Sequence, residues 1–137
     1  PTGWDFSNAI DYRSSQHGFP FHNLVGFMES HDEERLMYKN LQFGNSLGSY
    51  NTKDLNTALK RLEAAMCFLI PLRGPKMIWQ FGELGYDYSI EFNGRVGNKP
   101  IRWDYLTNAN RKRVYDVASN LAWLKNNHES YSKSTYL

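Results

Sequence analysis

Apolar residues along the chain gather in two short runs and in two longer stretches of helical spacing. The short runs are Leu-Val-Gly-Phe-Met at residues 24–28 and Met-Ile-Trp-Gln-Phe at residues 77–81. Neither run alternates apolar with polar residues, which is typical of strands that are buried on both faces of a parallel sheet. We therefore predict strands over about 24–28 and 76–81.

The first longer stretch predicts an amphipathic helix between the two strands. Leucines and a methionine recur every three or four positions, with charged residues between them, until Pro71 ends the pattern. We expect this helix over about 53–70, with Thr52 as its N-cap. The preceding residues 40–51 are rich in Asn, Gly and Ser and predict a loop.

The second longer stretch predicts a helix near the end of the chain. Valine, alanine and leucine repeat at helical spacing over about 110–125, and Thr107 or Asn108 is the expected cap. Between the second strand and this helix, residues 82–109 form an irregular stretch with many aromatics. A loop of this length is rare in a compact domain unless it has a function.

The order strand, helix, strand, helix favours a parallel α/β sheet with right-handed crossovers. Two parallel strands need neighbours on both sides, and no other convincing strand is evident in the sequence. We therefore expect residues 1–137 to be part of one larger domain, without a complete second domain.

Composition narrows the range of partners. The chain of 137 residues is 41% hydrophobic and 22% charged, as in soluble globular proteins, and its net charge is only +2. Without a dense basic stripe, neither nucleic acid nor a membrane surface is an expected partner, and no apolar run approaches the ~20 residues of a membrane span. The single cysteine, Cys67, predicts neither an internal disulfide nor a cysteine metal cluster. Aromatic residues, at 15%, suit a packed core or a sugar-binding cleft.

Directly after the first predicted strand stands Ser-His-Asp-Glu-Glu-Arg, residues 30–35. Active sites of parallel α/β folds are built on such loops. A structural interpretation stays open, because Ser30 and Glu33 have the spacing of a capping box and could start a short helix. Arg35 could also pair at the surface with a neighbouring carboxylate. From these residues alone, the structural interpretation is the stronger one.

The long loop after the second predicted strand holds two further groups of aromatic and charged residues. Residues 82–88 read Gly-Glu-Leu-Gly-Tyr-Asp-Tyr, without regular metal-ligand spacing and with too few glycines for a phosphate loop. Residues 100–104 read Pro-Ile-Arg-Trp-Asp. Trp79 and Trp103 are more often core residues than ligand contacts, because Trp is mostly buried in proteins.

Taken together, three segments resemble motifs of the α-amylase family, glycoside hydrolase family thirteen. Residues 27–35 resemble the end of the family's seventh barrel strand, where a small polar residue, His-Asp and then Arg follow an apolar run. Residues 75–83 are similar to the eighth strand, which ends in Gly-Glu, and residues 100–104 to a later Pro-x-x-Trp-Asp element. The resemblance covers about residues 20–125. It departs from the family at Ser30, where Asn is common, and before the last strand, where Gly-x-Pro is usual.

The resemblance implies a fragment of a (β/α)8 TIM barrel that covers about the seventh and eighth strand–helix units of an enzyme acting on α-glucans. It implies that Asp32 is the catalytic residue that stabilises the transition state, and that His31 binds the same sugar. Arg35 would have a supporting role in substrate binding. The remaining candidates for substrate binding are Trp79, Tyr86 and Trp103.

The family's nucleophilic Asp and acid/base Glu lie on the fourth and fifth strands, and nothing in this sequence corresponds to them. We therefore expect the parent protein to be a retaining glycosidase or transglycosidase, and this fragment alone to be inactive. Its expected partners are an α-glucan or maltooligosaccharide substrate and the rest of the parent barrel. No cofactor or metal is expected in this segment, and calcium in the parent is left open. Because its strands would expose apolar edges, the isolated chain should fold poorly or associate with itself.

Two alternatives stay open. The parent could be a catalytically inactive relative that binds sugar or serves as a structural subunit, which an upstream sequence without the nucleophile or the acid/base residue would favour. The chain could also be an independent small α/β interaction domain whose motifs arise by chance. Cooperative folding as a monomer, without affinity for maltooligosaccharides, would favour that interpretation.

Overall fold

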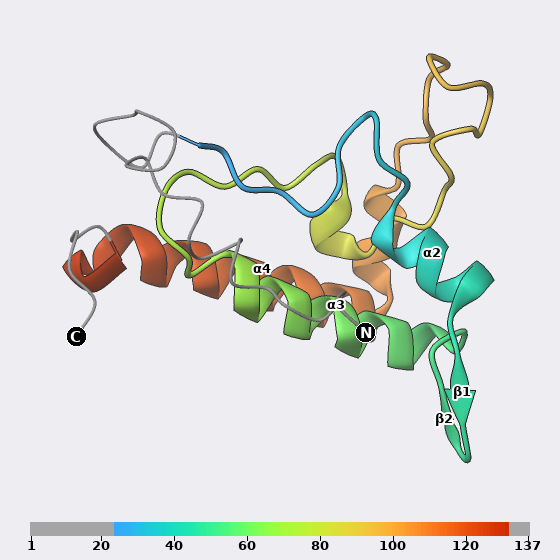
Figure 1. Ribbon diagram of the computed structural model, residues 1–137, viewed down its shortest axis with the longest axis horizontal. Helices are drawn as coiled ribbons and strands as arrows, with labels where there is room; N and C mark the ends of the chain where they lie inside the picture. Colours follow the sequence, from blue (N-terminus) through green and yellow to red (C-terminus); the bar gives the residue numbers. More distant parts are fainter. Residues whose placement is uncertain (1–23, 132–137) are drawn as a thin grey trace, which may run out of the picture.

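The computed structural model describes residues 24–131, and over this range it contains three α-helices and one two-stranded antiparallel sheet (Figure 1). The helices are α2 (Leu36–Phe43), α3 (Leu55–Leu69) and α4 (Ala109–Asn127). The remaining elements are strands β1 (Ser46–Leu47) and β2 (Tyr50–Asn51) and the 3-10 helices η3 (Gly82–Leu84), η4 (Trp103–Thr107) and η5 (Glu129–Tyr131).

Helix α3 coincides with the predicted helix 53–70 to within two residues at each end. The prediction that Thr52 caps it is wrong. The cap is Asp54, whose carboxylate accepts a hydrogen bond from the backbone N–H of Thr57 at 3.0 Å. The hydroxyl of Thr52 instead donates to the backbone oxygen of Asn45 at 2.6 Å, so Thr52 closes the preceding hairpin.

Helix α4 coincides with the predicted helix 110–125 and extends it by one residue at the start and two at the end. Its cap is Asn108, one of the two residues expected there. The Asn108 side chain accepts hydrogen bonds from the backbone N–H groups of Asn110 (3.0 Å) and Arg111 (3.2 Å). These bonds satisfy two of the donors that the first turn of a helix leaves without a partner.

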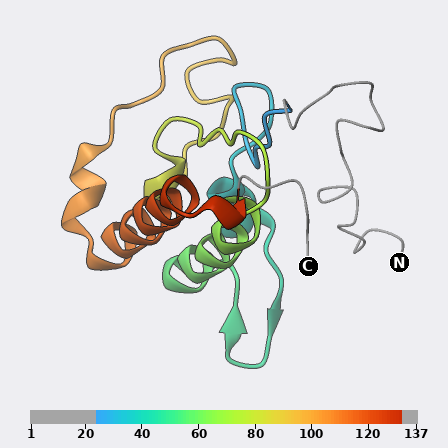
Figure 2. The same ribbon diagram turned by 90° about the vertical axis from the view of Figure 1, so that its left-hand side faces the viewer.

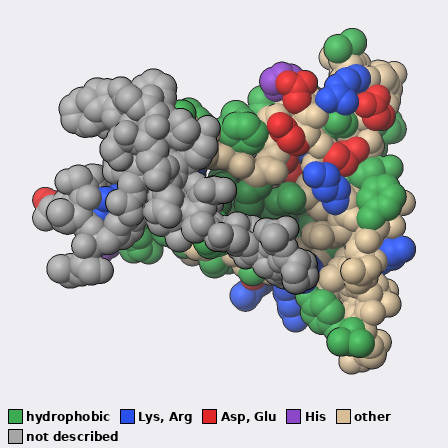
Figure 3. Space-filling model, in the orientation of Figure 1, with side chains coloured by type: hydrophobic (Ala, Val, Ile, Leu, Met, Phe, Trp, Pro, Cys, Tyr) green, Lys and Arg blue, Asp and Glu red, His purple; other side chains and the backbone are tan. Residues whose placement is uncertain are grey.

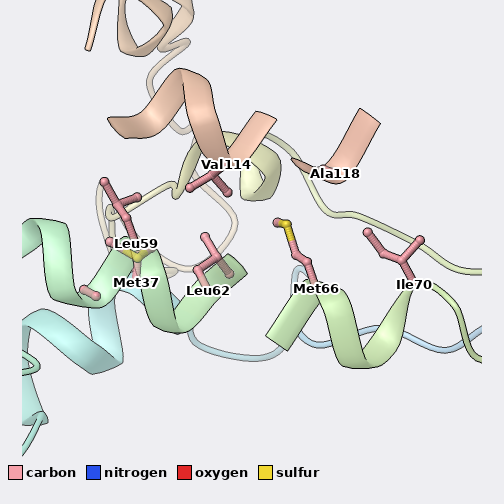
Figure 4. Packing of buried hydrophobic residues seen from close by; sticks show 8 residues of the cluster. Met37, Leu59, Leu62, Met66, Ile70, Val114 and Ala118 are labelled. Carbon is pink, nitrogen blue, oxygen red and sulfur yellow. The ribbon is translucent and has the colours of Figure 1, made fainter. Parts of the chain in front are cut away.

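The apolar core lies between the helices. Helices α3 and α4 pack side by side and run in the same direction, from right to left in Figure 1. Leucines and a methionine along one face of α3 meet small and branched side chains of α4, and α2 adds a methionine (Figure 4). Burial of such side chains contributes roughly 1.5–3 kcal/mol each. The buried residues are Met37, Ala58, Leu59, Leu62, Met66, Ile70, Val114 and Ala118.

The two predicted strands lie side by side and parallel, but they form one bridge and no ladder. The N–H of Gly26 donates to the oxygen of Pro75, and the N–H of Met77 donates to the oxygen of Gly26, both at 3.0 Å. Regular strands over 24–28 and 76–81 are therefore a wrong prediction. Parallel strands need neighbours on both sides, and within residues 24–131 each segment has only the other. Membership of a barrel stays a prediction.

The loop predicted over residues 40–51 is only partly a loop. Helix α2 continues to Phe43, and β1 and β2 then form a short hairpin. Its turn has Gly48 at φ 58°, the left-handed conformation that glycine adopts without steric cost. Figure 2 shows the hairpin projecting away from the rest of the described chain.

The irregular stretch predicted over residues 82–109 contains η3 and η4, and is otherwise loop until α4 begins. Its middle part rises above the helices at the upper right of Figure 1. None of the helices within residues 24–131 is both long and apolar enough to cross a membrane.

Candidate functional site

A cleft of about 600 Å³ opens between the loop that leads into α2 and the long loop before η4. It collects four of the six candidate residues predicted from the sequence, namely His31, Asp32, Arg35 and Trp79. The other side chains and backbone groups that line it are Gln80, Ile90, Arg95, Val96, Gly97, Asn98, Lys99 and Ile101.

His31 and Asp32 form one rim of the cleft. Their side chains are 71% and 64% exposed, and the His31 Nε2 atom lies 3.1 Å from an Asp32 carboxylate oxygen. The imidazole also lies near the Trp79 indole, with 5.8 Å between ring centroids and an angle of 51° between the planes. Figure 3 shows acidic and basic side chains gathered with a histidine at the upper right of the molecule. The rim thus offers a carboxylate, an imidazole and an indole to one ligand.

A tight turn presents these two side chains. The Ser30 hydroxyl donates to the Glu33 carboxylate and accepts a hydrogen bond from the Asp32 N–H at 3.1 Å. The pair expected as a capping box is therefore in contact, but helix α2 begins only at Leu36. The pair shapes the turn, because it fixes the backbone on both sides of His31 and Asp32.

A buried ion pair lies beneath the rim. The guanidinium of Arg35 donates to an oxygen of Glu29 at 3.0 Å, and the two side chains are 2% and 8% exposed. The other Glu29 oxygen accepts the N–H of Leu36 at 2.9 Å, which ties the carboxylate to the start of α2. Burial raises the pKa of Glu29, against the opposing effects of the Leu36 N–H and the Arg35 charge.

The Arg35 side chain therefore has a supporting position. It lines the cleft, but its guanidinium is bound to Glu29 and lies over the ring of Tyr86, 4.9 Å from the centroid. The surface pairing of Arg35 with a neighbouring carboxylate that the sequence left open is replaced by this buried pair.

Two of the predicted substrate-binding residues do not line the cleft. Tyr86 is only 1% exposed, and its hydroxyl donates to the backbone oxygen of Pro100 at 2.6 Å. Its burial leaves no surface for a sugar, so its assignment to substrate contact is wrong. Trp103 is 59% exposed but lies outside the cleft lining and packs edge-on against Phe81, with ring centroids 4.7 Å apart.

The sequence interpretation missed the residues that hold the long loop over the rim. Arg95 donates to the backbone oxygen of Asp32 at 2.7 Å and pairs with Glu91 at 3.1 Å. The Glu34 carboxylate accepts the N–H of Ile90 at 3.0 Å and the hydroxyl of Ser89 at 2.7 Å. The only signal in the sequence was the occurrence of charged residues within a long loop.

A second cluster of charged and aromatic residues lies where the loop meets α4. The Tyr105 ring lies between two guanidinium groups, 4.1 Å from that of Arg102 and 3.8 Å from that of Arg111. Arg111 is 5% exposed, donates to the backbone oxygens of Leu84 and Gly85, and pairs with Asp87 at 2.7 Å. It is therefore a buried link between α4 and the loop, although the sequence places it in a run of three basic residues.

Within residues 24–131, no group of three or more His, Cys, Asp or Glu side chains is arranged to hold a metal ion. No model of a known protein family matches the chain, and no curated protein matches it in sequence. The functional assignment therefore depends on the cleft and on the motifs that supply its rim.

Proposed function

We propose that the cleft of this chain is an α-glucan-binding subsite of a retaining glycosidase or transglycosidase of the α-amylase type. The observation that carries the proposal is the cleft rim, where the carboxylate of Asp32, the imidazole of His31 and the indole of Trp79 lie together. These three groups match the chemistry of a sugar, whose hydroxyls need charged or polar partners and whose ring faces pack on aromatics.

Asp32 would act on the transition state. Cleavage of a glycosidic bond develops positive charge on the sugar ring, and a carboxylate that accepts hydrogen bonds from ring hydroxyls stabilises that charge. The backbone of Asp32 is held by Arg95 and by the Ser30 turn, whereas its carboxylate is largely exposed. The carboxylate is therefore held in position by its backbone and stays accessible to a ligand. A group that contacts substrate needs both properties.

His31 would bind the same sugar. Its ring contacts the Asp32 carboxylate and lies near the Trp79 indole. The other ring nitrogen, Nδ1, can then form a hydrogen bond with a sugar hydroxyl, and the indole can cover an apolar face of the sugar ring. Such contacts accelerate the reaction only if they strengthen in the transition state.

The remaining chemistry would come from elsewhere in the parent protein. Retaining hydrolysis needs a nucleophilic carboxylate and a proton donor about 5 Å apart. No segment of this sequence resembles the motifs that carry these two residues in the α-amylase family. We therefore expect no hydrolysis of maltooligosaccharides by this chain alone, and a severe loss of kcat when Asp32→Asn is introduced into an intact parent enzyme.

Binding tests the proposal on the chain itself. Maltoheptaose is titrated into the full 137-residue chain and followed by NMR or calorimetry, with cellohexaose as the β-linked control. Asp32→Asn should weaken maltoheptaose binding about tenfold, because it removes a charge-assisted hydrogen bond. The matched control is Asp116→Asn on α4, which removes an exposed carboxylate paired with Lys112 and should leave the affinity unchanged.

Three results would contradict the proposal: no binding of maltoheptaose, equal binding of cellohexaose, or an Asp32→Asn affinity equal to that of Asp116→Asn. Binding that depends on Asp32, combined with a parent that lacks the nucleophile or the acid/base residue, would instead select the inactive sugar-binding relative.

A further inference from the structure

The ammonium group of Lys99 lies within a ring of backbone carbonyls. Its Nζ atom donates to the oxygens of Gly94 (2.7 Å), Phe92 (2.8 Å) and Gly97 (3.0 Å), and a longer contact reaches Arg95 at 3.4 Å. All four carbonyls belong to the loop that directly precedes Lys99 in the chain. The Lys99 ammonium therefore binds several backbone oxygens of its own loop at one point.

Besides Lys99, an ion pair between Arg95 and Glu91 (3.1 Å) and two backbone turns hold this loop. Within it, the backbone N–H groups of Gly94 and Gly97 donate to the oxygens of Glu91 (2.9 Å) and Gly94 (3.0 Å) in successive turns. Its tip is open to solvent, since Val96 is fully exposed. Four converging carbonyl dipoles repel one another unless a cation lies between them, and bonds to a charged donor are about twice as strong as neutral ones.

The loop reaches the rim of the cleft through Arg95. This residue contributes one of the carbonyls around Lys99, and its guanidinium donates to the backbone oxygen of Asp32 at 2.7 Å. The same guanidinium group lies 3.9 Å from an Asp32 carboxylate oxygen. The position of Arg95, and with it the support of the Asp32 backbone, therefore depends on how the loop is folded around Lys99.

We propose that Lys99 is a positioning residue of the cleft: its ammonium serves as a built-in cation that folds residues 91–99 and so places Arg95 against Asp32. Lys99 acts through Arg95 and needs no contact with a ligand. The inference concerns the shape of the cleft in the free protein. Only its consequence for sugar affinity rests on the proposed function.

Amide hydrogen exchange in the full chain tests the charge itself. In a Cys67→Ser background, Lys99→Cys removes the ammonium and creates the only thiol. Reaction with bromoethylamine then restores an ammonium at nearly the length of lysine, and reaction with iodoethanol gives a neutral side chain of the same length. Exchange at Gly94, Gly97 and Asp32 is the readout, and the amides of α3 serve as the internal reference.

The expected result is a rise in exchange of about tenfold at these three amides in Lys99→Cys, reversed by aminoethylation and not by hydroxyethylation. Equal recovery with both reagents would overturn the proposal, because the side chain would then act by filling space. Unchanged exchange in Lys99→Cys would overturn it as well.

A second variant tests the order of action. Arg95→Gln removes the guanidinium that holds the Asp32 oxygen, so the turn in which the Asp32 N–H donates to Ser30 should open and exchange at Asp32 should rise. Gly94 should stay protected, because the substitution keeps the backbone carbonyl that faces Lys99. Loss of protection at Gly94 equal to that in Lys99→Cys would show that Arg95 folds the loop, and would overturn the assignment to Lys99.

Sugar titration separates this inference from the proposed function. If aminoethylation restores slow exchange and no variant binds maltoheptaose, the positioning role of Lys99 stands and the proposed function fails. If Lys99→Cys binds maltoheptaose as tightly as the unaltered chain while its loop exchanges rapidly, the cleft does not depend on the loop, and Lys99 is not a positioning residue.

Discussion

The helical part and the loop part of the described chain are stabilised by different kinds of contact. Between α3 and α4 the buried side chains are apolar, and residues such as Leu59, Leu62 and Val114 are at most 3% exposed. Around the cleft and behind it, the buried side chains include Arg35 and Arg111, each paired with a carboxylate. The same chain thus combines a hydrophobic core with a network of buried charges.

The two kinds of contact impose different constraints. Apolar burial has no preferred direction, so a core accepts volume-conserving exchanges at small cost. A buried guanidinium needs each donor matched by an acceptor at a defined place, and Arg35 finds Glu29 on one side and the face of Tyr86 on another. Such a pair contributes little net stability but penalises any other arrangement. The polar network is therefore suited to fixing the exposed rim.

Removal of one partner of the buried ion pair should have the largest effect. Arg35→Met keeps the apolar volume but leaves the Glu29 carboxylate buried without its cation, which should lower the free energy of unfolding by about 4 kcal/mol at neutral pH. The measurement is urea denaturation followed by circular dichroism. As a control, Lys112→Met removes a lysine from a pair with Asp116 in which both side chains are about half exposed, and should change stability by less than about 0.5 kcal/mol.

The loss in Arg35→Met should also depend on pH. Burial already raises the pKa of Glu29 above its ordinary value, and without Arg35 the folded-state pKa rises further. The destabilisation should therefore be small below the unfolded-state pKa, where Glu29 is protonated in the folded and the unfolded state of both proteins. It should grow as pH rises from the folded-state pKa of the unaltered chain to the higher folded-state pKa of Arg35→Met. A loss that is constant between acid and neutral pH would show that the ion pair is not its cause.

A cavity in the apolar core should have the next largest effect and no pH dependence. Leu59→Ala removes a side chain that is 1% exposed between α3 and its neighbours, and should cost about 3 kcal/mol. Urea denaturation at the same two pH values should give the same loss. Leu47→Ala, at a position that is 85% exposed in the hairpin, should cost little. A pH-dependent loss in Leu59→Ala would contradict the division of the molecule into two parts.

The helical part was largely predictable from the sequence, because helical periodicity is a local signal. The spacing of Leu59, Leu62 and Met66 places them on one face, and Pro71 limits the helix at its end. What failed there also has a local cause. Thr52 and Asp54 both carry side chains that can cap, and only the contact of Thr52 with Asn45 decides between them.

In the loop part, only the residues that belong to a recognisable sequence motif could be predicted. His31, Asp32 and Trp79 were expected at one site, and the structure brings them into one cleft. The pairing of Glu29 with Arg35 and the bond from Arg95 to Asp32 were not expected. The bond from Arg95 joins residues far apart in the sequence, and its direction depends on how an irregular loop folds. The spacing of residues along the sequence carries no signal for such contacts, so only the three-dimensional structure reveals them.

A methyl group placed against the ion pair should have an intermediate effect. The Cβ atom of Gly82→Ala would lie 2.7 Å from the Glu29 carboxylate, which is fixed by two hydrogen bonds and cannot easily withdraw. The expected loss is about 2 kcal/mol in urea denaturation. Gly26→Ala is the control, because its Cβ atom would meet the methylene carbons of Lys76 at 3.3 Å, where a shift of a few tenths of an ångström suffices, and should cost less than Gly82→Ala. Equal losses in the two variants would show that Glu29 is not rigidly held.

The smallest expected effect lies where the two parts meet, at the start of α4. Asn108→Ala removes the acceptor of two backbone N–H groups, a change that typically costs about 1 kcal/mol. Here the first turn is also held from the loop side, since Arg111 binds Leu84 and Asp87 from within that turn. We therefore expect a loss of at most about 1 kcal/mol and little fraying of the first turn by amide exchange. In a background of Arg111→Met, the same cap removal should fray that turn. Equal fraying with and without Arg111 would show that the contacts of Arg111 with the loop do not stabilise the first turn of α4.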